Sequence, residues 1–263
     1  MISGVPGEAR GNMPELAKLT WPQARQAIQT CDVALLPVGS IEQHGPHLPL
    51  GTDWFIAHHI AAHVARAPRW LLLPGVVVGV SHAHIQFWGT LTVSADELRA
   101  FVLAAVRSAA THGMRRFVLV NGHGTNGAAL DEAARLLRAD GIAAYVFNWW
   151  QAIADTLSAL SLQPVDHAGP VETSLILAID PGLVCGDGLR DAGQGTEWGT
   201  FVEGVQVEFD AIRFTEAGNV GDPRLADAAK GRILIDEAVA GLTRFCVWLA
   251  DQRDDPLAAA HKP

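Results

Sequence analysis

Residues 33–53 read VALLPVGSIEQHGPHLPLGTD, and this stretch decides the fold. Val33 to Val38 is apolar and rich in Val and Leu, which is typical of a strand buried on both faces of a parallel sheet. A loop rich in Gly and Pro follows. Residues 53–66 then carry apolar side chains at helical spacing, with Thr52 placed to cap the helix. The stretch therefore predicts a strand, a stiff loop and a helix.

The same alternation continues along the chain. We expect apolar strands at residues 117–120 and 142–147, and a further apolar run at 70–78. Capping and proline signals predict helices at 94–112, 125–139, 170–179 and 223–251. The Gly-rich stretch 187–214 alternates Val205, Val207 and Phe209, which suggests a loop and an edge strand. Together these elements predict an α/β fold: a three-layer α/β/α sandwich with a mostly parallel central sheet, in a single domain over residues 1–263.

Composition excludes several classes of function. The chain has 263 residues, 49% of them hydrophobic, and a net charge of −9 without any cluster of Lys or Arg, so we expect no nucleic-acid partner. Its apolar runs fall short of the ~20 residues that cross a bilayer, and the N-terminal residues lack the apolar region of a secretory signal. We therefore expect no membrane partner and a cytoplasmic location. Cys31, Cys185 and Cys246 are odd in number and widely separated, which predicts ordinary core cysteines.

The loop after the first predicted strand concentrates side chains that bind metals. Glu42 and His44 are two residues apart, so in an extended segment both point to one side. Asp53 lies at the start of the next helix, where the helix dipole favours an ionised carboxylate. One imidazole and two carboxylates form a ligand set suited to Zn, Mn or Fe. In the alternative interpretation, Glu42 and His44 are solvated loop residues and Asp53 only caps its helix.

A second motif, NGHGTNG at residues 121–127, directly follows the strand expected at 117–120. His123 therefore lies at the carboxyl end of another strand, where open α/β sheets bind their ligands. Gly122 to Gly127 also matches the G-x-G-x-x-G pattern of dinucleotide-binding proteins. Such proteins need an acidic residue at the end of the following strand, where this chain has Asn148 to Trp150. An NAD-linked dehydrogenase is therefore the less favoured alternative.

A third motif, DHAGPVETS at residues 166–174, lies at the start of another predicted helix. His167 is a candidate general acid/base, and Glu172 a candidate ligand or a partner to one. Glu172 also fits a carboxylate that caps its helix, because it is at about the third helical position.

Taken together, the three motifs resemble those of the creatininase (creatinine amidohydrolase) family. Members carry G-S-x-E-Q-H-G-P-H-L-P-L-x-T-D, then N-G-H-G-x-N, then H-A-G-x-x-E-T-S, and this chain carries all three in that order. The resemblance implies an α/β/α hydrolase with two divalent metal ions (Zn, Mn or Fe), acting on carbon–nitrogen bonds other than peptide bonds. It also implies a homo-oligomer, commonly a hexamer.

The resemblance also implies a role for each motif residue. Four residues match the family's metal ligands, with one of them bridging the two ions: Glu42, His44, Asp53 (the bridge) and His123. Glu42 and His123 would complete one metal site and His44 the other. The ion pair would supply a hydroxide near neutral pH for attack on a carbonyl carbon. His167 matches the histidine that passes a proton to the leaving nitrogen.

Two departures from the family pattern bear on the substrate. Thr125 stands where creatininase has a glutamate ligand, so Glu172 or water would fill that place. Gly124 replaces a tyrosine, which argues against creatinine. We therefore expect hydrolysis of a small cyclic or formyl amide. Hydrolysis of a cyclic polyol-derived ketone, or a non-catalytic module that binds a metal or small molecule, are the alternatives.

Several other residues are candidates for substrate contact. Ser81 lies in a loop that resembles the family's active-site loop, and Trp149 and Trp150 end a predicted strand where they could stack on a planar ligand. His82 and His84 lie in the same loop as Ser81 and are weaker candidates. His59 and His63 are four apart on a predicted helix without the glutamate of a zincin motif, so we expect them to be structural.

Overall fold

The structure is a computed structural model that describes residues 15–252, except 68, 161, 163, 164 and 197. Four parallel strands form the central sheet: β1 (Val33–Val38), β2 (Trp70–Leu72), β3 (Arg116–Asn121) and β4 (Ala143–Asn148). The helices of the described residues are α1 (Trp21–Thr30), α2 (Thr52–Val64), α3 (Ala95–Ala110), α4 (Gly127–Ala139), α5 (Trp149–Ala152), α6 (Ala154–Ala159), α7 (Pro170–Ile179), α8 (Gly186–Asp191) and α9 (Ala228–Asp251). None of them is long and apolar enough to span a membrane.

The sheet has the strand order β2-β1-β3-β4. Ala34 of β1 pairs with Leu71 of β2 on one side and with Phe117 of β3 on the other. The chain therefore moves outward from β1 to β2 and then returns to the opposite side of β1. Such a reversal opens a crevice beyond the carboxyl ends of the two strands between which it occurs. Here those strands are β1 and β3.

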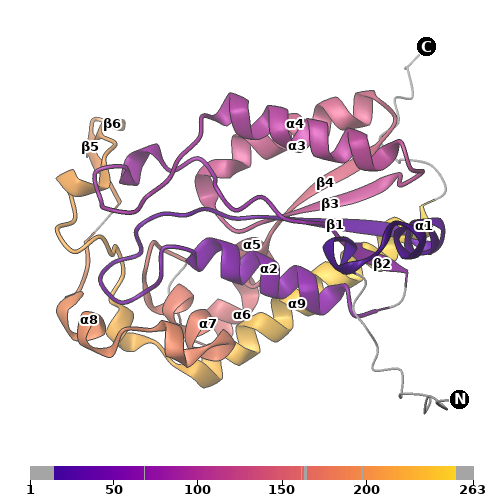
Figure 1. Cartoon of the computed structure of the whole chain (residues 1–263). Helices are drawn as coiled ribbons and strands as arrows, with labels where there is room; N and C mark the ends of the chain where they lie inside the picture. Colours follow the sequence, from indigo (N-terminus) through magenta and orange to yellow (C-terminus); the bar gives the residue numbers. More distant parts are fainter. Residues whose placement is uncertain (1–14, 68, 161, 163–164, 197, 253–263) are drawn as a thin grey trace, which may run out of the picture.

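Two apolar cores, one on each face of the sheet, make the three layers. Leu36 and Leu119 point toward α1, α3 and α4, whereas Leu35 and Val118 point toward α2, α5, α7 and α9. Figure 1 shows α3 and α4 above the sheet and α2, α7 and α9 below it. All six residues of β1 are buried, as expected of a central parallel strand. The expected three-layer α/β/α sandwich with a parallel sheet is confirmed.

Local signals set the helix boundaries. Ser94 accepts a hydrogen bond from the backbone of Glu97, and Glu97 accepts one from the backbone of Ser94, which is the capping box expected for α3. Gly141 follows α4 with φ +76°, the left-handed geometry that ends a helix. At the start of α2, Thr52 is the first helical residue instead of its cap, and its hydroxyl donates to Pro49.

The structure differs from the sequence-based expectation between residues 187 and 214. Among the described residues, Thr200–Val202 (β5) and Val205–Glu208 (β6) pair with each other alone, as an antiparallel hairpin separate from the central sheet. Val205, Val207 and Phe209 are exposed on this hairpin. The alternation is therefore genuine strand periodicity, but it does not mark an edge strand of the main sheet. The terminal helix α9 also begins later than expected, after a short turn at Pro223–Leu225.

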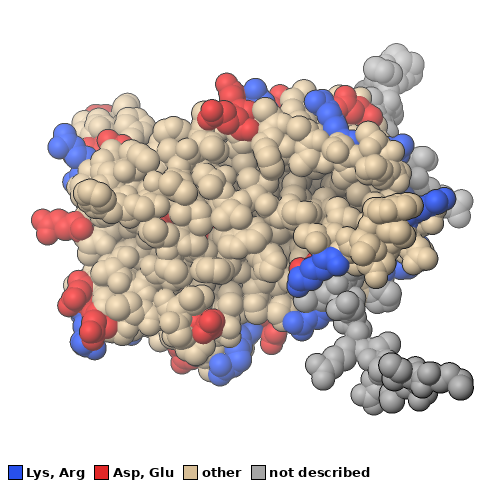
Figure 2. Space-filling model, in the orientation of Figure 1, with Lys and Arg blue, Asp and Glu red and all other residues tan. Residues whose placement is uncertain are grey.

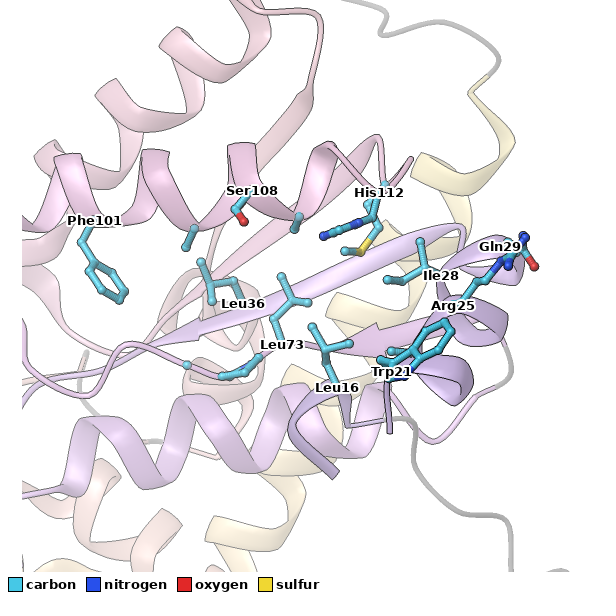
Figure 3. Close-up of a pocket in the computed structure, with 16 residues that line it drawn as sticks. Leu16, Trp21, Arg25, Ile28, Gln29, Leu36, Leu73, Phe101, Ser108 and His112 are labelled. Carbon is cyan, nitrogen blue, oxygen red and sulfur yellow. The ribbon is translucent and has the colours of Figure 1, made fainter. Parts of the chain in front are cut away.

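The molecule also carries an apolar pocket of about 770 Å³ between α1 and α3. Trp21 and Ile28 of α1, Phe101 of α3, and Leu36 and Leu73 from the sheet layer line it (Figure 3). Charged side chains on the face of Figure 2 lie mainly along its edges, and no concentration of Lys and Arg appears on that face.

Candidate metal centre and active site

All three sequence motifs converge beyond the carboxyl ends of β1 and β3. Glu42 and His44 lie in the loop after β1, Asp53 is the second residue of α2, and His123 follows β3. The Gly122 amide donates to the Val38 carbonyl, which extends the pairing of β3 with β1 and brings His123 beside α2. The third motif adds His167 and Glu172 at the start of α7.

Glu42, Asp53 and His123 form the first close group. The Nε2 atom of His123 is 3.2 Å from Oε2 of Glu42, and its Nδ1 atom is 3.1 Å from Oδ2 of Asp53. His123 Nε2 also lies 2.9 Å from the carbonyl oxygen of Val80, which can only accept. The proton of a neutral His123 therefore belongs on Nε2, and Nδ1 presents a lone pair toward Asp53.

His44 links this group to the third motif. Its Nδ1 atom is 3.1 Å from the carbonyl oxygen of Glu42, so the proton of the neutral ring belongs on Nδ1. The lone pair on Nε2 then faces Asp53 Oδ1 at 3.3 Å and Glu172 Oε2 at 3.8 Å. A backbone carbonyl that fixes a histidine tautomer in this way is a common support for a metal ligand.

The pKa values of the three carboxyl groups are shifted in different directions. Burial raises the pKa of Glu172 to about 8, against the opposing attraction of His44. Burial also raises the pKa of Glu42. Burial acts in the same direction on Asp53, but His44 and His123 outweigh it and hold the pKa of that carboxyl below its usual range. Asp53 is therefore the group held most firmly as an anion.

The two histidines that contact Asp53 are shifted in the opposite direction. Burial alone would lower the pKa of His44, but Asp53 and Glu172 raise it to about 10. Burial likewise opposes charge on His123, and Glu42 and Asp53 raise its pKa to about 9. The concentrated negative charge of the carboxylates thus attracts positive charge to this point, whether carried by protons or by metal ions.

Three buried atoms of the cluster have no hydrogen-bond partner within the described part of the chain: Glu42 Oε1, His44 Nε2 and Asp53 Oδ2. Leaving buried polar atoms unpaired is costly unless another group satisfies them. Glu42, Asp53 and His123 can each offer a ligand atom to one ion, and so can His44, His167 and Glu172. Carboxylate oxygens and imidazole nitrogens are ligands of zinc, manganese and iron, so these residues fit divalent metals.

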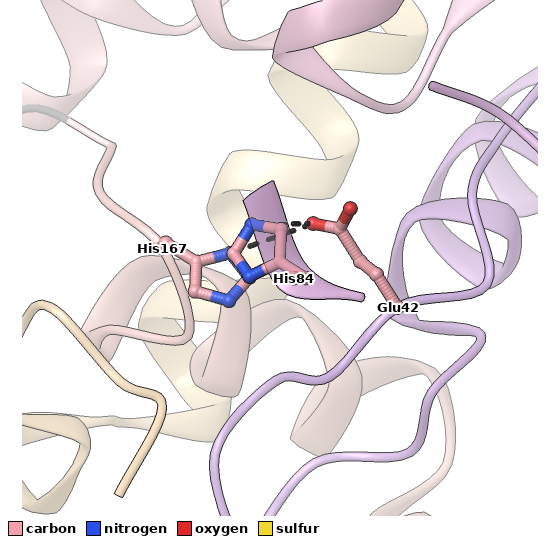
Figure 4. Close-up of side chains that lie close together, drawn as sticks. All are labelled: Glu42, His84 and His167. Carbon is pink, nitrogen blue, oxygen red and sulfur yellow. Dashed lines mark ion pairs between the residues drawn. The ribbon is translucent and has the colours of Figure 1, made fainter. Parts of the chain in front are cut away.

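His84 and His167 form a second pair of imidazoles beside Glu42. Their rings stack with centroids 4.4 Å apart, and each has a nitrogen 3.6 Å from Glu42 Oε1 (Figure 4). Burial, followed by the charge of His44, lowers the pKa of His84 to about 3 and that of His167 well below its usual value. The sequence interpretation gave His84 little weight. Its place in the same loop as Ser81 was the available signal, but nothing in the spacing placed it beside Glu42.

His47 is another residue of the first motif that sequence reasoning left without a role. It is buried, and its Nε2 atom is 2.9 Å from the Thr173 hydroxyl, which itself donates to the Gly169 carbonyl. His47 therefore ties the loop after β1 to the start of α7. This contact fixes the position of the first motif relative to the third.

The residues expected to contact substrate lie elsewhere or play a supporting part. Ser81 is buried and its hydroxyl pairs with that of Ser40, which also donates to Glu42. Trp149 is 1% exposed within the apolar core, so its ring offers no face to a ligand. Trp150 packs against the same core, edge to face with Trp149. Their position at the end of a strand suggested contact with substrate. In the structure Trp149 packs within the apolar core and Trp150 packs against it.

Other expectations are resolved by local geometry. Thr125 contacts His123 and the Val80 carbonyl through its hydroxyl. The rings of His59 and His63 lie beside each other on α2, and neither residue belongs to a group of candidate metal ligands. Of the cysteines, Cys246 is buried as expected, whereas Cys31 is half-buried and Cys185 is exposed.

The glycine pattern of the second motif has a packing explanation. A Cβ on Gly122 would overlap the carbonyl oxygen of Asp53, so glycine is required where β3 passes α2. Gly124 and Gly127 have open space around the corresponding position. Close packing between β3 and α2 therefore explains why Gly122 is a glycine, and no bound dinucleotide is needed to explain the pattern.

A family model described as Creatininase: Creatinine amidohydrolase matches residues 17–246. The chain belongs to the creatininase family. It is 36% identical over 246 residues to the mycofactocin precursor peptide peptidase of Mycobacterium ulcerans, covering 90% of this chain and 93% of the relative. It is 31% identical over 248 residues to the creatinine amidohydrolase of Pseudomonas putida, covering 86% of this chain and 94% of the relative. A solved structure described as "Creatininase Mn" matches with a TM-score of 0.80 and 28% identity, covering 92% of this chain and 100% of its own.

Membership of the creatininase family makes the chain a metal-dependent hydrolase. The family description and the named amidohydrolase support action on carbon–nitrogen bonds other than peptide bonds, although several relatives are named as peptidases. The clusters of carboxylates and imidazoles described above supply the residues that divalent metals require.

Proposed function

We propose that this creatininase-family member is a dinuclear metal-dependent amidohydrolase. The observation that carries the proposal is the convergence of Glu42, His44 and Asp53, each with a buried atom that lacks a hydrogen-bond partner. His123 completes the set from a different strand end. Asp53 is suited to the bridging position because its two oxygens face different histidines, Oδ1 toward His44 and Oδ2 toward His123.

Each ligand would have a distinct place. Glu42 and His123 would hold one ion together with Asp53, and His44 would hold the other. Glu172 fits the place of the family glutamate that Thr125 replaces, because its carboxylate lies 3.8 Å from His44 Nε2. Divalent ions bound there supply an activated water and polarise the carbonyl of the substrate.

The remaining chemistry falls to the protein's own side chains. His167 and Glu172 are the groups available for hydrogen bonding and proton transfer, and both lie in the same group of candidate ligand atoms as His44. Solvent reaches the cluster slightly at three side chains, since those of His167, His123 and Glu172 are 10%, 9% and 8% exposed, whereas that of Glu42 is fully buried. Substrate would therefore approach between His123 and the start of α7.

The proposed substrate is a small amide, cyclic or formyl. Relatives named as a creatinine amidohydrolase and as a precursor peptide peptidase support amide hydrolysis, and a relative named 3-dehydro-scyllo-inosose hydrolase, matched over 62% of this chain, keeps the cyclic ketone as an alternative. The higher identity to the peptidase favours a peptide as the second candidate. A panel containing formamides, lactams, creatinine and short peptides separates the two. The family's hexamer and a cytoplasmic location stay predictions.

The first test combines metal analysis with Asp53→Asn. We expect about two equivalents of Zn, Mn or Fe per parent chain, and reduced metal content with a loss of activity of more than roughly 100-fold in the variant, because the bridging carboxylate is lost. Asp131→Asn, an exposed acid on α4, is the matched control and should behave as the parent. A parent that holds no metal even after reloading would overturn the mechanism and favour a binding module.

A further inference from the structure

Asn126, the second asparagine of the NGHGTNG motif, is buried between the loops that follow β1 and β2. Its side-chain nitrogen Nδ2 donates to the Gly39 carbonyl oxygen at 3.0 Å, and its side-chain oxygen Oδ1 accepts from the Val80 amide at 2.9 Å. Gly39 directly follows β1, and Val80 lies in the loop after β2. The side chain is 0% exposed, so water does not compete for these contacts.

The orientation of this side-chain amide is determined, because both of its partners are backbone groups. The Gly39 carbonyl can only accept a hydrogen bond, and the Val80 amide can only donate one. Asn126 therefore meets one acceptor with its nitrogen and one donor with its oxygen, as a peptide group in a sheet would. Backbone pairing between the two loops ends nearby, where the Gly39 amide donates to the Val76 carbonyl at 2.9 Å. Asn126 adds a connection between the loops past that point.

Close packing holds the bridge in place on both sides. A Cβ on Gly79 would lie 2.6 Å from the Gly39 carbonyl oxygen and 2.6 Å from Asn126 Oδ1, so glycine is required there. On the other side, a Cβ on Gly39 would lie 2.5 Å from Cα of Trp54, the residue after Asp53. The loop after β1 is thus held between the start of α2 and the Asn126 amide.

The first of the two loops leads to Glu42. Ser40, next to Gly39, donates to Glu42 Oε2 at 3.3 Å. The Ser40 hydroxyl also pairs with that of Ser81, the residue after Val80. The position of the Glu42 carboxylate therefore depends on both loops that Asn126 joins.

The second loop supports His123. The carbonyl oxygen of Val80 lies 2.9 Å from His123 Nε2, while the Asn126 backbone amide donates to the His123 carbonyl at 3.2 Å. The imidazole and the Asn126 amide thus belong to one turn, and both contact Val80. His123 Nε2 lies 3.2 Å from Glu42 Oε2, and these two residues are the ligands proposed to share one ion.

We propose that Asn126 is a positioning residue of the metal centre, which joins the loops after β1 and β2 and thereby sets the separation of Glu42 from His123. Its influence is selective, because His44, proposed for the other ion, faces Glu172 at the start of α7. Loss of the bridge should therefore weaken one ion far more than the other. This inference rests on the proposed dinuclear function.

Metal content and affinity test the proposal, with Zn-loaded protein and competition by a chromogenic chelator as the readout. The parent should hold about two ions per chain, whereas Asn126→Leu, which keeps the approximate size of the side chain and removes both hydrogen bonds, should hold about one. The affinity for the lost ion should fall by roughly 10- to 100-fold, as on removal of other groups that orient metal ligands. Gly79→Ala should have the same effect, since its methyl group would displace the Asn126 amide.

Val106→Ala, a truncation of a buried side chain on α3, is the control for a general loss of stability. It should keep both ions at the affinity of the parent. Two ions bound to Asn126→Leu as tightly as to the parent, or an equal loss of affinity for both, would overturn the proposal. A parent without any metal would instead contradict the proposed function, and the role of Asn126 at the ions would fall with it.

Hydrogen exchange of the Val80 amide, in protein stripped of metal, tests the bridge itself. Exchange should be slow in the parent and in Asn126→Asp, which keeps the acceptor for Val80, and at least about tenfold faster in Asn126→Leu. The Leu73 amide, which donates to the Leu35 carbonyl at 2.9 Å, is the internal reference and should not change. Equal exchange at Val80 in the parent and Asn126→Leu would show that Asn126 does not hold this loop.

Discussion

Asp166, the residue before His167, is half-buried, and its Oδ1 atom is buried without a hydrogen-bond partner among the described residues. Burial raises the pKa of this carboxyl from 3.8 to about 6. The folded protein therefore binds the proton more tightly than the unfolded chain, and the stability that the proton contributes below pH 3.8 is lost as the pH rises through 6.

Asp166→Asn should consequently stabilise the protein at pH 8, where the native carboxyl is ionised, by about 1 to 3 kcal/mol, and have little effect near pH 4. Urea unfolding at the two pH values measures the difference. The variant Asp131→Asn, which removes an exposed acid on α4, serves as the matched control for the loss of one carboxylate. An equal effect of Asp166→Asn at both values would contradict the assignment.

At the residue scale, the sequence predicted which site residues lie together when they belong to one motif. Glu42, His44 and Asp53 could be grouped because a single loop joins them, and the strand-end rule added His123. The contacts of Gln43 with His84, His167 and Gly218 span 41, 124 and 175 positions. They depend on how three separate loops pack, which neither spacing nor residue type specifies.

At the scale of elements, α7 and α9 cross closely because Gly231 lies at their contact. A Cβ on Gly231 would overlap the carbonyl oxygen of Ser174 in α7. Gly241, ten residues further along α9, would place its Cβ 3.3 Å from the side chain of Ala152, which is tight but can be relieved by a small movement. The two glycines thus differ in environment within one helix.

Gly231→Ala should destabilise the protein by about 2 kcal/mol or more, since the clash exceeds the gain in helix propensity. Gly241→Ala should range from neutral to about 1 kcal/mol stabilising. Because Glu172 lies on α7, we also expect Gly231→Ala to reduce activity. Denaturant unfolding of both variants tests the ranking, and equal stabilities would show that the crossing is not limited by this glycine.

Predictions for the elements succeeded where the local pattern and the tertiary role coincide. The bounds of β1 and α7 match those expected. The buried apolar run of β1 is bounded by polar or Gly residues, and the proline at the start of α7 marks where that helix begins. The alternation of Val205, Val207 and Phe209 predicted strand but could not name its partner, since a hairpin and an edge strand share the same period.

At the scale of the whole molecule, the proposed ions bind atoms that only the folded chain brings together. A ligand that binds the folded state alone stabilises it by about 2.7 kcal/mol at a hundred times its Kd. Treatment with a chelator should therefore lower the Tm of the parent by roughly 5 to 10 °C, reversibly on adding Zn or Mn. Asp53→Asn should show a much smaller change in Tm. A parent whose Tm ignores both chelator and metal would argue against resident ions.

The pairing of Ala34 with Phe117 has a consequence for the order of events during folding. Ligands that follow β1 meet the ligand that follows β3 only after the intervening helices and β2 have been placed, and such long-range parallel pairing is slow. We therefore expect the ions to bind only after the ligand residues have come together, so that they do not nucleate folding. Added zinc should leave the refolding rate unchanged and slow unfolding, so that the metal prolongs the lifetime of the native state without speeding its formation.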